Sequence, residues 1–212
     1  MRKLYEELFS ALKEHDKEKA VKLAMNALEN RVVDVITLYE ELLTPILNSV
    51  IEEFQDEDML IWEEHVRSEI VLCIIENAYL YILKEREQRG VNKEEEVIVL
   101  CPKFEDHIIG AKMAADIFTI AGYETIFIGS NTPWNTVIKA IEVKKPKIVC
   151  ISVTNFYNIV ETKNTIENIK KNFNYDIKFI LSGYAFRNSD NLYKEIGGDI
   201  YIKDLKDIFL LG

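Results

Sequence analysis

The glycines of this chain are confined to its second part. The chain has 212 residues and eight glycines, and the first of them is Gly90. Glycine destabilises helices and serves tight turns and places where backbones approach closely. The part without glycine therefore favours long helices, whereas the remainder has the turns that alternating elements need. This distribution predicts two domains of different construction, at 1–89 and 90–212.

Apolar residues in the first domain recur at helical spacing. The segments with this spacing are 4–12, 20–28, 35–50 and one that starts near residue 60 and reaches residue 82. Asp16 and Asp34 stand where helix N-caps are expected, and Pro45 could kink the third helix. We predict a four-helix-type unit with one bent helix.

The second domain alternates short apolar runs with helical stretches. The predicted strands are 97–101, 124–129, 147–152, 178–183 and 199–202, and the predicted helices are 108–121, 134–143, 158–172 and 189–196. Strands that are apolar throughout suit burial on both faces. The alternation predicts an α/β fold with a doubly wound, parallel, five-stranded Rossmann-like sheet. The charged stretch 86–96 is the predicted linker.

Charge and cysteine usage limit the function classes. Acidic residues outnumber basic ones, 36 to 26, for a net charge of −10. Because phosphate backbones repel such a surface, we expect no direct nucleic-acid binding. Cys73, Cys101 and Cys150 lie far apart in apolar runs, which predicts buried, reduced thiols in a cytoplasmic protein. The sequence has no signal-peptide core and no run near the roughly 18 apolar residues of a membrane span.

The loop after the first predicted strand carries the most reactive residue types. Ligands of open parallel sheets bind at the carboxyl ends of the strands, and this loop contains Glu105, Asp106 and His107, followed by Gly110. It has neither the GxGxxG of dinucleotide folds nor the GK[ST] of phosphate loops, which argues against those two ligand classes.

An imidazole close to a carboxylate suits ligation of a transition metal. One histidine cannot complete a protein-only metal site, but it can supply an axial ligand to a metal held in a macrocycle. The residues by themselves also allow an ordinary surface histidine near a helix start.

The pattern E-x-H-x-x-G, formed by Glu105, His107 and Gly110, resembles the D-x-H-x-x-G signature of the cobalamin-binding domains of methionine synthase and the corrinoid methyl carriers. Two further matches follow in the same order. Ser152 and Thr154 stand where the family has S-x-L, and Ser182-Gly183 stands where it has Gly-Gly; all four end predicted strands. The helical domain corresponds to that family's helical cap, so the resemblance spans about residues 4–210.

The resemblance implies a cobalt corrinoid, cobalamin, as cofactor. Its lower benzimidazole would leave the cobalt and thread into the α/β domain, with His107 as the lower ligand instead. Gly110 would allow close approach of this nucleotide tail, and Ser152, Thr154, Ser182 and Gly183 would line its slot. Because Glu105 is longer than the family's aspartate, its hydrogen bond to His107 could be displaced, or Asp106 could supply that bond.

A narrower resemblance points to light-sensing cobalamin-dependent regulators. Residues 121–141 are similar to their segment with Gly122, Gly129, Asn131 and Pro133, and Gly183 to Phe186, which include Tyr184, are similar to their G-x-A-F. Their cap has W-x9-E-H above the corrin. Here Glu64-His65 takes the E-H place and Phe54 the tryptophan place, so an aromatic ring would shield the upper ligand.

The resemblance favours a binding protein that acts through a protein partner. The first alternative is a methyl carrier for partner methyltransferases, and the second is a cobalamin-dependent sensor or regulator, which could respond to light. An adenosylcobalamin mutase subunit and a protein with an empty, degenerate site are further alternatives. The oligomeric state is open, a homo-oligomer included.

Overall fold

The computed structural model describes residues 1–189 and 191–211. Its internal contacts divide the chain into two compact units, Met1–Glu85 and Arg86–Gly212. The helix that ends the first unit continues to Arg89, so the boundary between the units falls inside a helix. In the described part of the chain, no helix combines the length and apolar character that crossing a membrane requires.

The first unit is helical, as predicted. It contains α1 (Arg2–Lys13), α2 (Lys17–Glu29), α3 (Val35–Thr37), the π-helical turn η1 (Leu38–Leu43), α4 (Thr44–Glu53) and most of α5 (Glu57–Arg89). Asp16 and Asp34 are N-caps, because their carboxylates accept hydrogen bonds from the backbone N–H groups of Lys19 and Thr37, both at 2.9 Å.

The third predicted helix is continuous but irregular. The π-helical turn η1 stands directly before α4, which has Pro45 in its first turn. Proline lacks the N–H of a regular helix and its ring clashes with the carbonyl four residues earlier. A widened turn relieves that clash, and the helical segments follow one another without a break.

The second unit is an α/β domain. Its elements are β1 (Glu96–Pro102), α6 (Ile109–Ile120), β2 (Glu124–Thr132), α7 (Trp134–Lys144), β3 (Ile148–Ser152), η2 (Phe156–Asn158), α8 (Ile159–Asn172), β4 (Lys178–Ser182), η3 (Tyr184–Phe186), α9 (Leu192–Glu195), β5 (Ile200–Ile202) and η4 (Leu205–Leu210). The predicted strands and helices are confirmed with small shifts of their ends. The last predicted helix, 189–196, is shorter, and position 190 within it lies outside the described residues.

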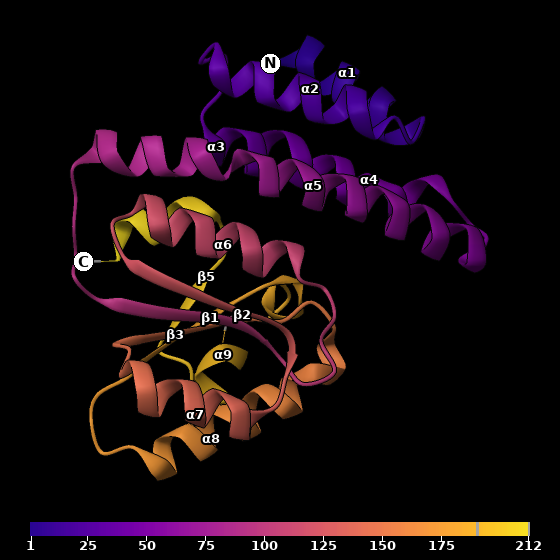
Figure 1. The fold of residues 1–212 in the computed structure, drawn as a ribbon. Coiled ribbons are helices and arrows are strands. Elements are labelled where there is room, and N and C mark those ends of the chain that lie inside the picture. Colours follow the sequence, from indigo (N-terminus) through magenta and orange to yellow (C-terminus); the bar gives the residue numbers. More distant parts are fainter. Residues whose placement is uncertain (190, 212) are drawn as a thin grey trace. The chain divides into compact units, whose positions relative to one another are not determined.

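The sheet is fully parallel, in the order β2-β1-β3-β4-β5. Figure 1 shows α6 and η4 on one face and α7 and α8 on the other. Alternate residues of the central strands pack toward α7 and α8, among them Leu100, Ile151 and Leu181. The order reverses between β1 and β3, and such a switch point is where open sheets bind ligands.

The predicted linker 86–96 is tied to the second unit. Its first part is the last turn of α5, and its last residue begins β1. The backbone N–H of Lys93 donates to the carbonyl of Gly122 at 3.0 Å, and its ammonium donates to the Tyr123 hydroxyl at 2.9 Å and to the Leu211 carbonyl. The stretch is therefore anchored to the α/β domain at Lys93, although most of its residues are exposed.

The cysteines are free thiols. Cys101 and Cys150 are buried in β1 and β3, and burial raises the pKa of each to about 12. Cys73 is only half-buried, so the prediction of burial is wrong at this position. Cys73 lies on α5, and a helix in a small unit has a solvent-facing side even within an apolar run.

Candidate functional site

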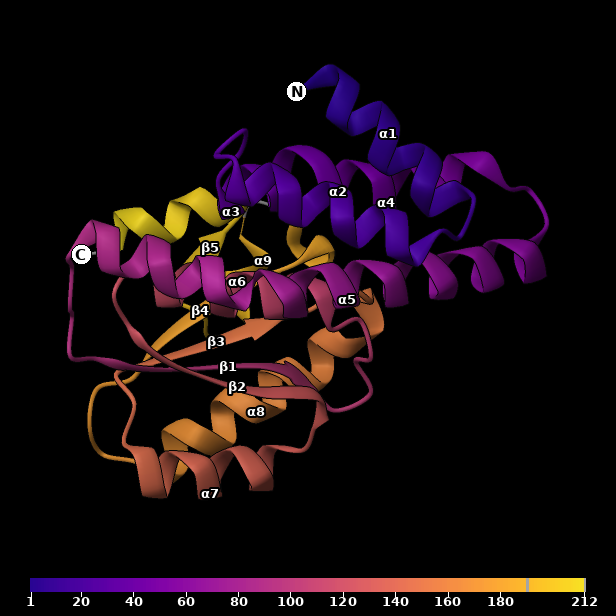
Figure 2. The ribbon, with the colours of Figure 1, turned by 45° about the horizontal axis from the view of Figure 1, so that its top comes forward.

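The carboxyl ends of the parallel strands form one edge of the sheet, here called the carboxyl edge. The loops that leave β1 and β2 emerge at this edge (Figure 2). The loop after β1 carries the predicted metal ligand, and the segment after β3 runs beside it. These two strands flank the switch point, so the predicted residues meet where the topology places ligand sites.

A buried carboxylate holds the His107 ring. Glu105 is completely buried, and its Oε1 lies 2.5 Å from Nδ1 of His107 and accepts the His107 backbone N–H at 3.2 Å. The His107 side chain keeps 54% of its surface exposed. Glu105 itself supplies the hydrogen bond, although it is longer than aspartate, and Asp106 is exposed beside it.

The second carboxylate oxygen of Glu105 is held by the segment after β3. Oε2 accepts the backbone N–H groups of Thr154 at 2.9 Å and Asn155 at 2.8 Å, and the side-chain amide of Asn158 at 3.0 Å. Burial by itself would raise the pKa of Glu105. The hydrogen bonds from His107, Asn158 and the Asn155 N–H outweigh it and lower the pKa to about 2. The carboxylate is thus fixed in its charged form beside the imidazole.

Two asparagine side chains brace the same loop. The Asn131 Oδ1 accepts the backbone N–H of Phe104 at 2.9 Å, and the Asn131 N–H donates to the Glu105 carbonyl at 2.9 Å. The Asn158 amide also donates to the Phe104 carbonyl at 3.1 Å. A register irregularity at the end of β2, where Gly129 pairs with Leu100, brings Asn131 to this position.

Residues 95–208 match a family described as B12 binding domain, and residues 4–76 match a second family with the same description. The chain belongs to the B12-binding domain family. Cobalamin is its cofactor, and its fold is the family's α/β domain with a helical cap. A search of curated proteins found none that matches the sequence.

Solved structures share the fold of this B12-binding protein at low sequence identity. The monomethylamine corrinoid protein of Methanosarcina barkeri is 14% identical, with a TM-score of 0.84 over 99% of this chain and 97% of that one. A cobalamin-binding protein of Desulfitobacterium hafniense is 15% identical, with a TM-score of 0.55 over 98% and 96%. The methanol:cobalamin methyltransferase complex of Methanosarcina barkeri is 18% identical, with a TM-score of 0.51 over 98% of this chain and 77% of that one.

Three predicted residues of the tail slot fit a ligand at the carboxyl edge. Ser152 and Ser182 are paired neighbours at the ends of β3 and β4, and both are buried. The Ser182 hydroxyl lies beside the Cys150 thiol, which is a weak hydrogen-bonding group. The hydroxyl has no oxygen or nitrogen partner among the described residues. A Cβ added at Gly110 would lie 3.8 Å from Ser152 Oγ, an ordinary contact, so protein packing does not require glycine there. A hydrogen-bonding ligand that comes close to both positions accounts for the orphan hydroxyl and for the glycine.

Gly183 is required by the protein itself. Its φ is +104°, and an added Cβ would lie 2.3 Å from the Val153 carbonyl oxygen. Any other residue would push β4 away from the end of β3. The next residue, Tyr184, begins η3 at the carboxyl edge and is exposed.

The predicted upper-face residues belong to the helical unit. Phe54 ends α4, half-buried, with its ring 5.8 Å from the guanidinium of the buried Arg67. Glu64 and His65 lie on α5, with Glu64 Oε2 3.7 Å from His65 Nε2, and Glu64 accepts the Ser68 hydroxyl at 2.6 Å. Their position above a corrin stays a prediction.

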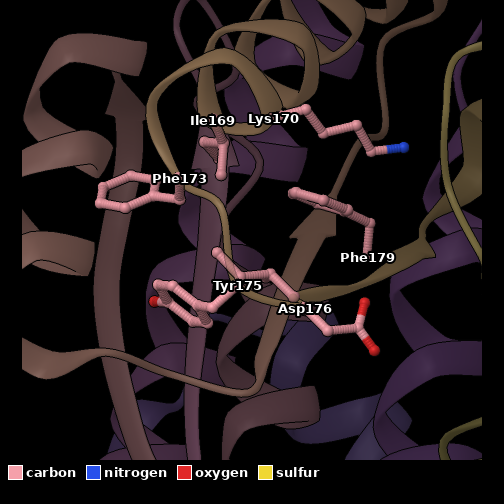
Figure 3. Close-up of a pocket in the computed structure, with 7 residues that line it drawn as sticks. Ile169, Lys170, Phe173, Tyr175, Asp176 and Phe179 are labelled. Atoms are coloured by element: carbon pink, nitrogen blue, oxygen red, sulfur yellow. The ribbon is translucent and has the colours of Figure 1, made fainter.

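A separate small cavity lies away from the carboxyl edge. It has a volume of about 130 Å³ and is lined by the end of α8, the segment after it and the start of β4. Figure 3 shows its aromatic and charged lining, with Phe173 and Tyr175 edge to face at 5.9 Å. It contains none of the predicted site residues.

Within residues 1–189 and 191–211, no group of three or more His, Cys, Asp or Glu side chains could hold a metal ion. The sequence analysis missed Asn155 and Asn158, which complete the site. Their only signal is that polar residues directly follow a buried strand at a sheet edge where ligands bind.

Proposed function

We propose that this protein binds cobalamin with His107 as the lower cobalt ligand and carries a methyl group for partner methyltransferases. The observation that carries the proposal is the hydrogen bond between the buried, charged Glu105 and Nδ1 of His107. A carboxylate at Nδ1 keeps the proton on that nitrogen and directs metal binding to Nε2. The benzimidazole would then leave the cobalt.

The rest of the carboxyl edge supports this role. The orphan Ser182 hydroxyl and the spare room at Gly110 suit the displaced nucleotide tail, with Ser152, Thr154 and Gly183 beside it. When bound, the corrinoid supplies a cobalt centre that accepts and releases a methyl group. The polypeptide orients that centre from below through one fixed imidazole.

Structural similarity to proteins of methyl-transfer systems supports the methyl-carrier role. One is a monomethylamine corrinoid protein, and another belongs to a methanol:cobalamin methyltransferase complex. A partner methyltransferase is the protein that such a carrier requires. The reduced thiols are consistent with a cytoplasmic protein.

Electron paramagnetic resonance of the Co(II) form tests the lower ligand directly. Protein labelled with ¹⁵N-histidine is loaded with unlabelled cobalamin. An imidazole ligand then gives a nitrogen doublet, whereas the ¹⁴N benzimidazole gives a triplet. We expect the doublet in the wild type and in His65→Ala, and its loss in His107→Ala. A triplet in the wild type would refute ligation by His107.

A sensor is the second candidate, because the spacing of Phe54, Glu64 and His65 resembles the W-x9-E-H of the sensory branch. Illumination of protein loaded with methylcobalamin or adenosylcobalamin separates the two roles. A carrier transfers the methyl group in the dark when a partner methyltransferase and its methyl acceptor are added. A sensor changes its oligomeric state or its partner binding only after light.

A further inference from the structure

Phe104 holds a backbone conformation that disfavours its own side chain. Its φ is +69°, in the left-handed region that suits glycine. A bulky residue there costs on the order of 1–2 kcal/mol. Strain of this kind is retained where neighbouring groups enforce it and where the side chain has a use.

The enforcing groups are two side-chain amides from different elements, the end of β2 and η2. Asn131, after a bulge in β2, accepts the Phe104 N–H at 2.9 Å, and Asn158, after β3, donates to its carbonyl at 3.1 Å. Asn158 also donates to Glu105 Oε2 at 3.0 Å. The backbone of Phe104 is therefore locked to the same network that orients His107.

Phe104 itself is 59% exposed. The Lys103 ammonium lies 4.4 Å from the centroid of its ring. Among the described residues of the α/β unit, the exposed aromatic rings all follow the carboxyl ends of strands. They are Phe104, Trp134, Phe156, Tyr157 and Tyr184. Exposed apolar groups gathered at one edge mark a binding surface.

We propose that Phe104 contacts the corrin ring itself and raises corrinoid affinity. The inference rests on the proposed ligation by His107, because the occupant is a flat, largely apolar macrocycle centred on that imidazole. Phe104 lies three positions before His107 in one rigid loop. A residue whose backbone is bonded to the network that holds His107 suits a cofactor with one set position better than a mobile protein partner.

Substitution at Phe104 separates strain from contact. Phe104→Gly removes both the strain and the ring, whereas Phe104→Ala removes the ring and leaves a Cβ in the left-handed conformation. We expect the apoprotein of Phe104→Gly to melt a few degrees higher than the wild type. Both variants should bind methylcobalamin roughly tenfold more weakly, and Phe104→Tyr should bind it as the wild type does.

Lys145 provides the matched control. It is an exposed residue with a φ of +51° at the C-cap of α7, where its N–H donates to the Ile141 carbonyl at 2.8 Å. Lys145→Gly relieves similar strain far from His107. Its melting temperature should also rise, with unchanged corrinoid affinity.

The readouts are thermal melting of the apoprotein, titration with methylcobalamin, and the ¹⁵N doublet of the Co(II) form. Wild-type affinity in both Phe104→Ala and Phe104→Gly would overturn the proposal. Weak binding by Phe104→Gly alone would assign the effect to loop flexibility and would also overturn it. Loss of the doublet in these variants would show an action through His107 instead of ring contact. Absence of the doublet in the wild type would instead remove the proposed function.

Discussion

The Nδ1 atom of His107 lies 2.5 Å from an oxygen of Glu105, a carboxylate that is completely buried and accepts five hydrogen bonds from four residues. The pair couples an exposed imidazole to the interior of the sheet. Of the two nitrogens of the imidazole, the one that carries the proton faces Glu105, and the other can then bind cobalt.

Glu105→Gln should therefore change the tautomer more than the fold. The glutamine oxygen can accept from the Thr154 and Asn155 N–H groups, which turns its NH₂ toward Nδ1 of His107. The proton then moves to Nε2, and cobalamin affinity should fall about 10–100-fold with loss of the ¹⁵N doublet. Asp106→Asn is the control, since Asp106 is exposed. Equal affinity in both variants would contradict the role of Glu105.

Asn158→Ala should destabilise the site from its second side. It removes the amide that donates to Glu105 and to the Phe104 carbonyl. We expect a loss of about 1.5–3 kcal/mol in the free energy of unfolding, measured by urea denaturation. Asn155→Ala keeps its backbone N–H bond to Glu105 and should cost less than about 1 kcal/mol. The reverse order would show that Asn158 is dispensable.

Ser182→Ala should affect stability and binding in opposite directions. Its buried hydroxyl has no ordinary partner in the described chain, so removing it should stabilise the apoprotein by about 1 kcal/mol. Cobalamin affinity should fall, because the ligand loses a hydrogen bond. Thermal melting with and without cobalamin measures both. A variant that binds as tightly as the wild type would place the nucleotide tail elsewhere.

Two glycines should respond differently to alanine. At Gly183 the new Cβ meets the Val153 carbonyl at 2.3 Å with φ +104°, so we expect a loss of at least about 3 kcal/mol. At Gly110, in the first turn of α6, the contact is 3.8 Å, and alanine should raise apoprotein stability by up to about 1 kcal/mol. Gly110→Ala should nevertheless weaken cobalamin binding. Denaturant unfolding measures the two stabilities and titration measures cobalamin binding. Equal loss of stability in Gly183→Ala and Gly110→Ala would contradict the prediction.

Arg67 should be the most sensitive charged residue of the helical unit. It is 1% exposed and donates to Glu53 at 2.8 and 3.2 Å and to Glu63 at 3.1 Å. Arg67→Met removes the buried guanidinium that both carboxylates share and should cost about 3–5 kcal/mol. Lys13→Met, which removes an exposed partner 3.3 Å from Glu53, should cost less than about 1 kcal/mol. Adding Glu53→Gln and Glu63→Gln should restore part of the loss.

The same cluster predicts a pH dependence. Hydrogen bonding to Arg67 lowers the pKa of Glu53, and that of Glu63 is also lowered, since His15 and Arg67 outweigh the opposing effect of burial. Carboxylates with a lowered folded pKa stabilise the fold above their ordinary pKa of about 4.3 and lose that contribution as the pH falls through the lowered value. In the wild type, the free energy of unfolding of the helical unit should fall when the pH is lowered below about 4. It should fall less steeply in the variant that combines Arg67→Met with Glu53→Gln and Glu63→Gln.

Local patterns determined most of the fold. The N-caps Asp16 and Asp34, the five strands and the helices between them follow from spacing and from residue types that act over a few positions. The motif from Glu105 to Gly110 was readable for the same reason, because its members are close in sequence. Cys73 shows the limit, since an apolar run does not reveal which side of a helix faces solvent.

The tertiary structure decided how the site is held. Thr154, Asn155 and Asn158 stand 49, 50 and 53 positions from Glu105, and only the parallel pairing of β1 with β3 brings them to its carboxylate. The strained backbone of Phe104 likewise depends on side-chain amides of β2 and η2, which are distant in sequence. Such bonds join groups whose separation along the chain carries no periodic signal. The sequence was therefore sufficient to predict His107 as the ligand, whereas the orientation of its imidazole depends on the assembled sheet.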